Sequence, residues 1–259
     1  MSIAVVTWNV NSIRARQERL LAFLARHSPD VVCLQELKVE DAQFPFEALR
    51  AAGYHAVTAG QKTYNGVAIL SKEEATDVAR GLDDGEDDAQ ARLILATVRG
   101  VRIASAYFPN GGEPESPKYP YKLAWMKRLR AYLDRHVDPA SPFLLCGDYN
   151  VAPTDLDIKN PEHWRASVLA NDEIRAALEH VRAYGLEDVF RKHHPGEAIF
   201  SWWDYRMLGF PKNDGLRIDH LYATPSIAAR SEQAFVDREE RKGKAPSDHA
   251  PVFCVFSDG

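Results

Sequence analysis

The first third of the chain alternates between strand-like and helix-like patterns of hydrophobic positions. Ile3 to Asn9 is rich in β-branched residues, which favours a strand. After Ser12, a residue suited to an N-cap, apolar residues recur at helical spacing up to about His27 and predict a helix. The apolar run from Val31 to Leu34 predicts a second, buried strand. This strand–helix–strand order is typical of an α/β protein.

The rest of the sequence predicts further strands in close succession and two amphipathic helices. Short turns separate the strand-like runs between positions 66 and 107, and this spacing favours antiparallel or mixed pairing. The predicted strands are Gly66–Leu70, Arg92–Val98, Val101–Tyr107, Phe143 into the CGDYNVAP segment, Ile218–Ala223 and Pro251–Phe256, and the helices are Tyr121–His136 and Asp172–Tyr184. Because no linker rich in Pro, Gly or Ser divides the sequence, we expect residues 1–259 to form one α/β domain. We expect two mixed sheets to pack face to face between outer helices.

Composition and charge narrow the class of protein. No stretch approaches the ~18 consecutive apolar residues of a membrane-spanning helix, and the first residues lack the pattern of a signal peptide. The three cysteines lie in apolar runs, which indicates reduced core residues of a cytoplasmic protein. The net charge of −5 does not indicate a nucleic-acid-binding protein, but basic residues predominate from Lys118 to Arg135 and acidic ones from Asp83 to Asp88. Both runs are typical of solvated surface, although a local basic face can still bind a polyanion.

Polar side chains stand where several predicted strands end. Glu36 follows the second strand, Asp148 and Asn150 follow the CGDYNVAP strand, and Asn9 and Asn11 follow the first. Side chains two positions apart on an extended segment point to the same face, so each pair presents two oxygens in one direction. Oxygen ligands with few carboxylates suit Mg²⁺, which keeps several waters and leaves room for phosphate oxygens. The sequence has no zinc-ligand spacing, P-loop or G-x-S-x-G elbow.

Each of these polar residues, taken alone, also fits an ordinary structural role. An Asp after a strand is commonly a turn residue or a helix cap, and Glu36 fits a solvated strand end. The Asp248–His249 pair fits a loop before the last strand. Asp219 is harder to explain in this way, because a carboxylate inside a strand needs a partner. Pairing with His249 would fix the imidazole tautomer and raise its pKa.

Several segments of the sequence resemble the exonuclease III family, the bacterial apurinic/apyrimidinic endonucleases of the endonuclease/exonuclease/phosphatase superfamily. In chain order they are TWNVNSIRAR, LQELK, NGVAILSK, AYFPNG, GDYNVAPTDLD, SWWDY, GLRIDHLYAT and PSDHAPV, and they span Trp8 to Val252. Glu36, GDYN and the terminal SDH are signals of the superfamily, whereas AYFPNG, PTDLD, SWWDYR and GLRID are more specific to its DNA-repair branch. The resemblance implies a four-layer α/β sandwich.

The resemblance also implies a metal and phosphate site. Glu36 would be the main Mg²⁺ ligand with Asn9 close to it, and Mn²⁺ would substitute for Mg²⁺. Asn11 stands where some relatives carry an acid, which puts a second metal position in doubt. The other residues expected to line this pocket are Asp148, Asn150 and Asp248.

Hydrolysis of a phosphodiester gives each of these groups a task. An in-line water loses a proton, the phosphoryl oxygens gain charge and the 3′-oxygen leaves. We expect Asp148 to take the proton and Asn150 to orient the water. We expect His249, held by Asp219, to donate to a phosphate oxygen, as does Tyr107. The alternative makes His249 the base and Asp148 the proton donor to the leaving group, and residue types alone do not choose between them.

Residues for recognising damaged DNA follow from the same resemblance. Trp202, Leu216 and Ile218 match positions that form an apolar pocket for a flipped-out abasic sugar. Core packing is the competing role for one of the adjacent tryptophans, Trp202 and Trp203. Arg206 matches a position that relatives insert into the duplex at the lesion. The candidate phosphate contacts are Arg14, Asn110, Lys118 and Arg92, the last of which pairs alternatively with Asp87 or Asp88.

The sequence therefore predicts a Mg²⁺-dependent DNA-repair phosphodiesterase that incises duplex DNA 5′ to abasic sites, with 3′→5′ exonuclease and 3′-end-cleaning activity. Its expected partner is double-stranded DNA with abasic sites or damaged 3′ ends. We expect a monomer in the cytoplasm, at the nucleoid through its DNA. The alternatives are another phosphoesterase on the same scaffold, such as a non-specific nuclease, or a catalytically silent nucleic-acid-binding regulator. SWWDYR and GLRID disfavour the first alternative, and the retained acids disfavour the second.

Overall fold

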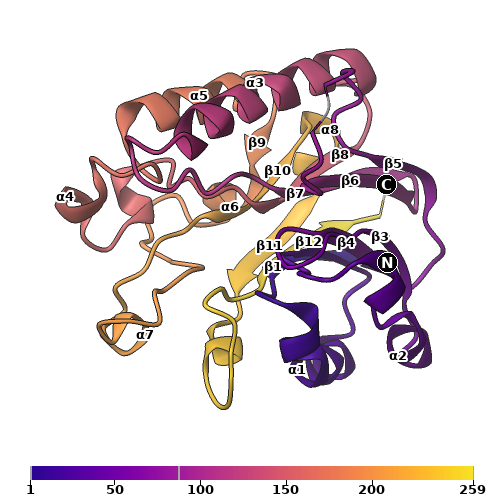
Figure 1. Ribbon diagram of the computed structural model, residues 1–259. Helices are drawn as coiled ribbons and strands as arrows, with labels where there is room; N and C mark the ends of the chain where they lie inside the picture. The colour runs from indigo at the N-terminus through magenta and orange to yellow at the C-terminus, as the bar shows by residue number, and fades with distance from the viewer. Residues whose placement is uncertain (1, 87, 259) are drawn as a thin grey trace.

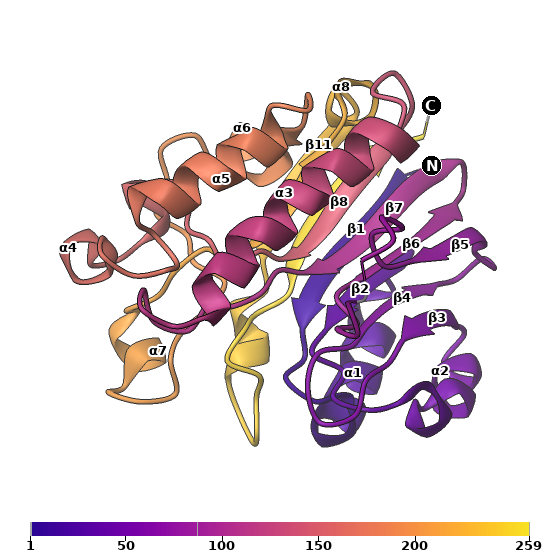
Figure 2. The ribbon, with the colours of Figure 1, turned by 45° about the horizontal axis from the view of Figure 1, so that its top comes forward.

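Two six-stranded sheets lie face to face in the computed structural model, which describes residues 2–86 and 88–258 (Figure 1). Helices cover the outer face of each sheet, so the molecule has four layers (Figure 2). The predicted four-layer α/β sandwich is confirmed. Among the described residues, no helix combines the length and the apolar character needed to span a membrane.

Both sheets are mixed, and each contains a parallel pair of strands. In the first sheet β1 and β2 run parallel, and in the second β7 and β8 do, while the other neighbours run antiparallel. The order of the first sheet is β11 (Ser231–Val236), β12 (Val252–Ser257), β1 (Ser2–Asn9), β2 (Val31–Gln35), β4 (Val67–Ser71) and β3 (His55–Ala59). The order of the second is β5 (Thr76–Arg80), β6 (Leu93–Val98), β7 (Val101–Tyr107), β8 (Phe143–Asp148), β10 (Asp219–Ala223) and β9 (Glu187–Asp188).

Two long helices and several short ones form the outer layers. The first sheet is covered by α1 (Ile13–His27) and α2 (Phe46–Ala51), and the second by α3 (Lys118–His136) and α5 (Asp172–Arg182) (Figure 2). The shorter helices are α4 (Pro161–Trp164), α6 (Val189–His193), α7 (Gly209–Lys212) and α8 (Pro225–Ala228), with 3₁₀ turns at Asp41–Gln43, Asp155–Asp157 and Arg238–Arg241.

Alternating side chains divide the apolar core into layers. On β1, Ile3 and Val5 pack between the two sheets, whereas Trp8 packs towards α1. On β8, Leu144 and Cys146 pack between the sheets in the same way. This alternation fixes which face the residue at the end of each strand presents, and the site depends on it.

The strands that the sequence pattern did not reveal, β3, β5, β9 and β11, all lie at sheet edges. An edge strand is covered on fewer sides, so its polar residues are tolerated and its hydrophobic alternation is weak. β5 shows this directly, because most of its residues are exposed.

The basic and acidic runs of the sequence meet in the structure. Arg128 donates to Asp84 Oδ2 at 2.6 Å and to Asp88 Oδ2 at 2.9 Å, and Tyr121 donates to Asp88 as well. Lys122, in the same run, is fully buried. The expectation of solvated surface is therefore wrong for Lys122, which is buried, and Arg128 pairs with acidic residues of the other run.

Candidate active site

The candidate catalytic residues meet at one end of the sandwich, between the two sheets. The parallel pairs β1–β2 and β7–β8 end at this edge, where parallel strands of open α/β sheets commonly present functional groups. Asn9, Tyr107 and Asp148 end β1, β7 and β8 at alternation positions that face the other sheet. Asp219 begins β10 directly opposite Asp148. The sequence thus delivers polar groups from both sheets into one space.

Asn9 joins the two carboxylates at the centre of this space. Its Nδ2 donates to Glu36 Oε1 at 2.8 Å and to Asp148 Oδ2 at 2.9 Å. Its Oδ1 accepts from the backbone N–H of Asn11 at 2.9 Å and is turned away. In this arrangement Asn9 is a hydrogen-bond donor between the carboxylates, and its expected role as a metal ligand stays a prediction.

The pairs Asn9/Asn11 and Asp148/Asn150 do not lie on extended backbone. Asn11 and Asn150 have φ values of 45° and 51°, in the left-handed region. In each pair the backbone N–H of the second residue donates to the side-chain oxygen of the first, at 2.9 Å. The same Asx turn therefore ends β1 and β8, and the expectation that each pair shares one face of a strand is wrong.

Asn150 uses both atoms of its side-chain amide within the protein. Its Nδ2 donates to the carbonyl of Phe108 at 3.0 Å, and its Oδ1 accepts from Asn110 Nδ2 at 3.0 Å. Beneath it, the buried Lys122 donates to the backbone carbonyl of Asn150 at 2.6 Å and to that of Val168 at 2.7 Å. Asn150 thus holds the loop of Asn110 in place, and its expected role as a metal ligand stays a prediction. Sequence reasoning placed Lys122 on the surface and missed this contact.

Asp219 and His249 form the predicted pair. His249 Nδ1 lies 3.0 Å and 2.9 Å from the two carboxylate oxygens of Asp219, and Ser201 Oγ donates to Asp219 Oδ2 at 2.6 Å. The other ring nitrogen, Nε2, lies 3.7 Å from Asp148 Oδ2. Although burial opposes the charged form, Asp219 and Asp148 raise the pKa of His249 to about 10. Sequence reasoning missed Ser201, the first residue of SWWDY.

Burial raises the pKa values of two further groups of the centre, Asp148 and Tyr107. Burial, with contributions from Asp219 and Glu36, raises the pKa of Asp148 to about 7 against the opposing effect of His249. Burial and the neighbouring Glu36 and Asp148 raise the pKa of Tyr107 well above its ordinary value. Tyr107 therefore stays a neutral hydroxyl that can donate a hydrogen bond.

A hard divalent cation fits the oxygen atoms of this centre. One ligand atom from each of Glu36, Asp148 and His249 lies within 4.8 Å of the others. Glu36 and Asp148 contribute carboxylate oxygens to this group, the ligand type preferred by a hard cation that keeps most of its waters. Lys38 Nζ, which sequence reasoning missed although it lies in LQELK, contacts Glu36 Oε2 at 2.9 Å.

Asp248 turns away from this group of ligands. Its Oδ1 accepts from Asn11 Nδ2 at 3.0 Å, and its Oδ2 accepts from Trp202 Nε1 at 3.0 Å. Both oxygens thus accept hydrogen bonds from amide and indole donors, and the expected role of Asp248 as a metal ligand stays a prediction. Its position instead links Asn11 to the residues predicted to hold the lesion.

The three residues predicted to form the lesion pocket lie together beside His249. The backbone of Trp202 pairs with Leu216 and with His249. Leu216 and Ile218 are buried in one apolar cluster, and the partly buried Trp202 packs against it. Trp203 is fully buried in a separate cluster, so core packing is the role of Trp203.

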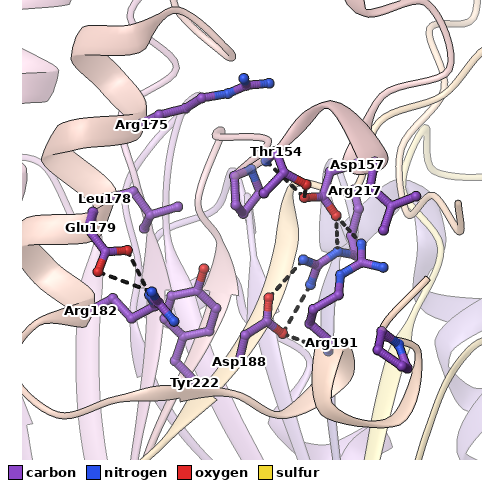
Figure 3. Close-up of a pocket in the computed structure, with 13 residues that line it drawn as sticks. Thr154, Asp157, Arg175, Leu178, Glu179, Arg182, Asp188, Arg191, Arg217 and Tyr222 are labelled. Atoms are coloured by element: carbon purple, nitrogen blue, oxygen red, sulfur yellow. Dashed lines mark hydrogen bonds and ion pairs between the residues drawn. The ribbon is translucent and has the colours of Figure 1, made fainter. Parts of the chain in front are cut away.

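A buried ion-pair network holds the segment that carries Leu216 and Ile218. Arg217 turns to the opposite side of this segment, where its Nε donates to Asp157 Oδ1 and its Nη2 to Asp188 Oδ2, both at 2.7 Å (Figure 3). These arginine contacts lower the pKa of Asp157 to about 2 even though burial acts in the opposite direction. Sequence reasoning missed this pair, although both residues lie in the segments PTDLD and GLRID.

The expected DNA contacts differ in exposure. Arg14 is exposed on α1, and Asn110 and Lys118 are exposed at the rim of a cleft beside Tyr107. Arg206 is exposed and pairs with Asp204 at 2.7 Å, and the apolar Met207 and Leu208, which sequence reasoning missed, are exposed next to it.

Arg92 is largely buried. It donates to Gln90 and to the carbonyl of Tyr107, and its guanidinium lies 4.8 Å from the centre of the Tyr107 ring. Asp88 pairs with Arg128 instead, so the alternative pairing of Arg92 with Asp88 is wrong, and Asp87 lies outside the described residues. Arg92 therefore contacts both the backbone and the ring of Tyr107, and it also lines the cleft beside that residue.

Comparisons with known proteins agree with this geometry. Residues 6–249 match the model of the Endonuclease/Exonuclease/phosphatase family. Exodeoxyribonuclease III of Haemophilus influenzae is 38% identical, and the match covers 97% of this chain and 98% of that protein. An AP endonuclease structure from Archaeoglobus fulgidus is 40% identical with a TM-score of 0.96, covering 99% of this chain and 100% of that one. A 3′ phosphatase from Neisseria, solved bound to a product DNA hairpin, is 41% identical with a TM-score of 0.94, covering the same shares. The chain therefore belongs to the Endonuclease/Exonuclease/phosphatase family.

Proposed function

We propose that this chain is a DNA-repair phosphodiesterase that incises duplex DNA 5′ to abasic sites and also trims damaged 3′ ends. The observation that carries the proposal is the Asp219–His249–Asp148 arrangement beside Glu36, with the segment of Trp202, Leu216 and Ile218 next to it. Relatives that carry the names AP endonuclease, 3′ phosphatase and 3′-5′ exonuclease support the same reaction class.

Asp148 is the group that we assign to deprotonate the attacking water. It is buried, it points between the sheets, and His249 beside it carries a positive charge. The water oxygen forms the new bond to phosphorus as its proton passes to Asp148, and the bond between phosphorus and the 3′-oxygen breaks. The contacts of His249 with Asp219 and Asp148, which raise its pKa, support this assignment over the alternative in which His249 is the base.

His249 and Tyr107 are assigned to stabilise the phosphoryl oxygens. His249 presents Nε2–H, because Asp219 accepts from its Nδ1–H. Tyr107 presents a hydroxyl that burial and its acidic neighbours keep protonated. Donors that are already fixed in place act on developing charge without reorganising during the reaction.

Glu36 and Asp148 are assigned to hold Mg²⁺, for which Mn²⁺ substitutes. A divalent cation held there would supply charge neutralisation at the phosphate and the leaving group. Lys38 and Asn9 orient the two oxygens of Glu36 from opposite sides. We propose that the chain acts as one catalytic domain and a monomer, on DNA in the cytoplasm.

Incubation with a duplex that carries a single abasic site tests the proposal. We expect incision on the 5′ side of the site with Mg²⁺ and none after removal of the cation by EDTA. An undamaged duplex of the same sequence is the control for non-specific nuclease activity. Absence of abasic-site incision in both conditions would contradict the proposed function, and equal incision of the two duplexes would favour a non-specific nuclease.

A further inference from the structure

A cleft of about 550 Å³ lies beside the catalytic carboxylates and has no task in the reaction as described so far. Its size is in the range of sites that hold small molecules. Arg92 and Lys118 contribute positive charge to its lining, and the described lining residues include no Asp or Glu. In a protein with a net charge of −5, such a surface suits an anionic occupant.

Three tyrosines give the cleft an aromatic lining. Tyr107 forms the side next to the catalytic centre, Tyr121 lies behind Arg92, and Tyr64 stands at the rim. Tyr64 is 67% exposed, one of the few large hydrophobic side chains so exposed. A positively charged groove with aromatic rings is the usual combination for binding unpaired bases of a nucleic-acid strand, such as a base that has left its pair at a 3′ end.

The backbone around Tyr64 is held in an unfavourable conformation. Its neighbours Thr63 and Asn65 have φ values of 72° and 56°, and a positive φ is rare for a β-branched residue such as Thr63. Asn65 accepts from the backbone N–H of Lys38, and Gln61 accepts from the backbone N–H of Ala91, so both sides of the loop are tied down. Strain that is maintained in this way is typical of functional segments.

The order of strands places this cleft and the lesion pocket on opposite sides of Asp148. β8, which ends at Asp148, lies between β7, which ends at Tyr107, and β10, which begins at Asp219. The cleft adjoins Tyr107, whereas Leu216 and Ile218 precede β10. A strand of DNA whose scissile phosphate lies at Asp148 therefore extends into the lesion pocket on one side and into the cleft on the other.

We propose that the cleft binds the nucleotide on the 5′ side of the scissile phosphate, with the base of that nucleotide against Tyr64. This inference rests on the proposed function, in which the abasic sugar on the 3′ side occupies the lesion pocket. Removal of a 3′-phosphate leaves nothing on the 3′ side, so the cleft is then the site that holds the terminal nucleotide. The lesion pocket therefore matters most for a duplex with an abasic site, and the cleft matters most for a 3′-phosphate end.

Tyr64→Ala, compared with Tyr64→Phe, tests the assignment. The substrate is a duplex with a recessed 3′-phosphate, and released inorganic phosphate is measured. We expect Tyr64→Ala to raise KM about tenfold with kcat within about twofold, because stacking on an aromatic ring contributes to binding rather than to chemistry. Tyr64→Phe keeps the ring and should match the parent. A KM for Tyr64→Ala that equals the parent's, or an equal loss in Tyr64→Phe, would overturn the assignment.

Two further measurements separate the cleft from the rest of the site. A substrate whose 3′-phosphate is on a terminal sugar without a base should show no difference between Tyr64→Ala and the parent. Trp202→Ala should reduce abasic-site incision by a larger factor than it reduces removal of the 3′-phosphate. A Tyr64→Ala defect of equal size on the base-free end would refute contact with the base. If the parent neither incises abasic duplex nor removes a 3′-phosphate, the proposed function fails; if the parent is active and only the Tyr64 results fail, the cleft assignment alone is wrong.

Discussion

His249 Nδ1 lies within 3.0 Å of both carboxylate oxygens of Asp219. An imidazole held in this way has one nitrogen committed to a carboxylate and the other, Nε2, free to face the substrate. Since Asp148 lies on that free side, the ring is between two acids and carries a proton near neutral pH. The pair therefore favours His249 as a donor and leaves the role of base to Asp148.

Asp148→Asn should keep the fold and DNA binding while turnover falls by roughly 10² or more, the usual contribution of a general base. The substituted amide can still accept the hydrogen bond from Asn9, so the change removes the basicity and the negative charge of the side chain while keeping its shape. Single-turnover incision of an abasic duplex measures the chemical step, and a binding assay without Mg²⁺ is the control. A near-normal rate would return the role of base to His249.

Glu36→Gln should weaken binding of the divalent cation because it removes charge from the principal ligand while preserving shape. The loss in Mn²⁺ affinity should exceed the roughly tenfold that removal of an outer-shell partner costs. Titration of Mn²⁺ followed by electron paramagnetic resonance measures this directly without relying on activity. Glu40→Gln, at an exposed position nearby, is the matched control. Identical titrations of Glu36→Gln and the parent would show that Glu36 is not the principal ligand.

Arg217→Met should destabilise the protein by about 3 kcal/mol, because it leaves the buried Asp157 and Asp188 without their main cation. Arg182→Met, which removes an exposed pair with Glu179 at the same cavity, should change stability by no more than about 0.5 kcal/mol (Figure 3). Urea unfolding of both variants measures the difference. Equal midpoints would mean that the buried network does not stabilise the fold.

His220 should make the folded state less stable as the pH falls. Its Nε2 contacts the carbonyl of Val151 at 2.9 Å and its Nδ1 lies 3.0 Å from Arg217 Nη1, so the folded ring is neutral. Burial, followed by the charge of Arg217, lowers its pKa from 6.5 to about 4. The unfolded chain takes up a proton below about pH 6.5 and the folded one does not, so stability is lost between those values, by about 2 to 3 kcal/mol at pH 4.5.

The pH dependence is measured by urea unfolding at pH 7 and pH 4.5 in the parent and in His220→Gln. The difference between the two proteins isolates this residue from the other groups that titrate in the same range. A smaller loss in His220→Gln is expected. An equal loss in both proteins would assign the effect to other residues.

The pattern of continuous apolar runs was sufficient to predict the central strands and the two-sheet fold, because a buried strand has apolar residues on both faces. It was insufficient for the edge strands, where exposed residues such as those of β5 weaken the pattern. The pairing of Asp219 with His249 was predictable because a carboxylate within a strand requires a partner. The positive φ of Asn11 and Asn150 was not, since asparagine adopts both extended and left-handed backbone. The burial of Lys122 was not predictable either, because its three carbonyl acceptors come from segments that are distant in the sequence.

The catalytic groups belong to both sheets, and this has a consequence for the newly made chain. Glu36 and Asn9 come from the first sheet and Asp148 from the second. His249 lies three residues before the start of β12, the late strand of the sequence that pairs with β1. A chain that is still being synthesised, or has formed one sheet alone, has no complete hydrolytic centre. The catalytic groups therefore come together only after both sheets, including β12, have formed. We expect the chain to be unable to cut DNA before that point.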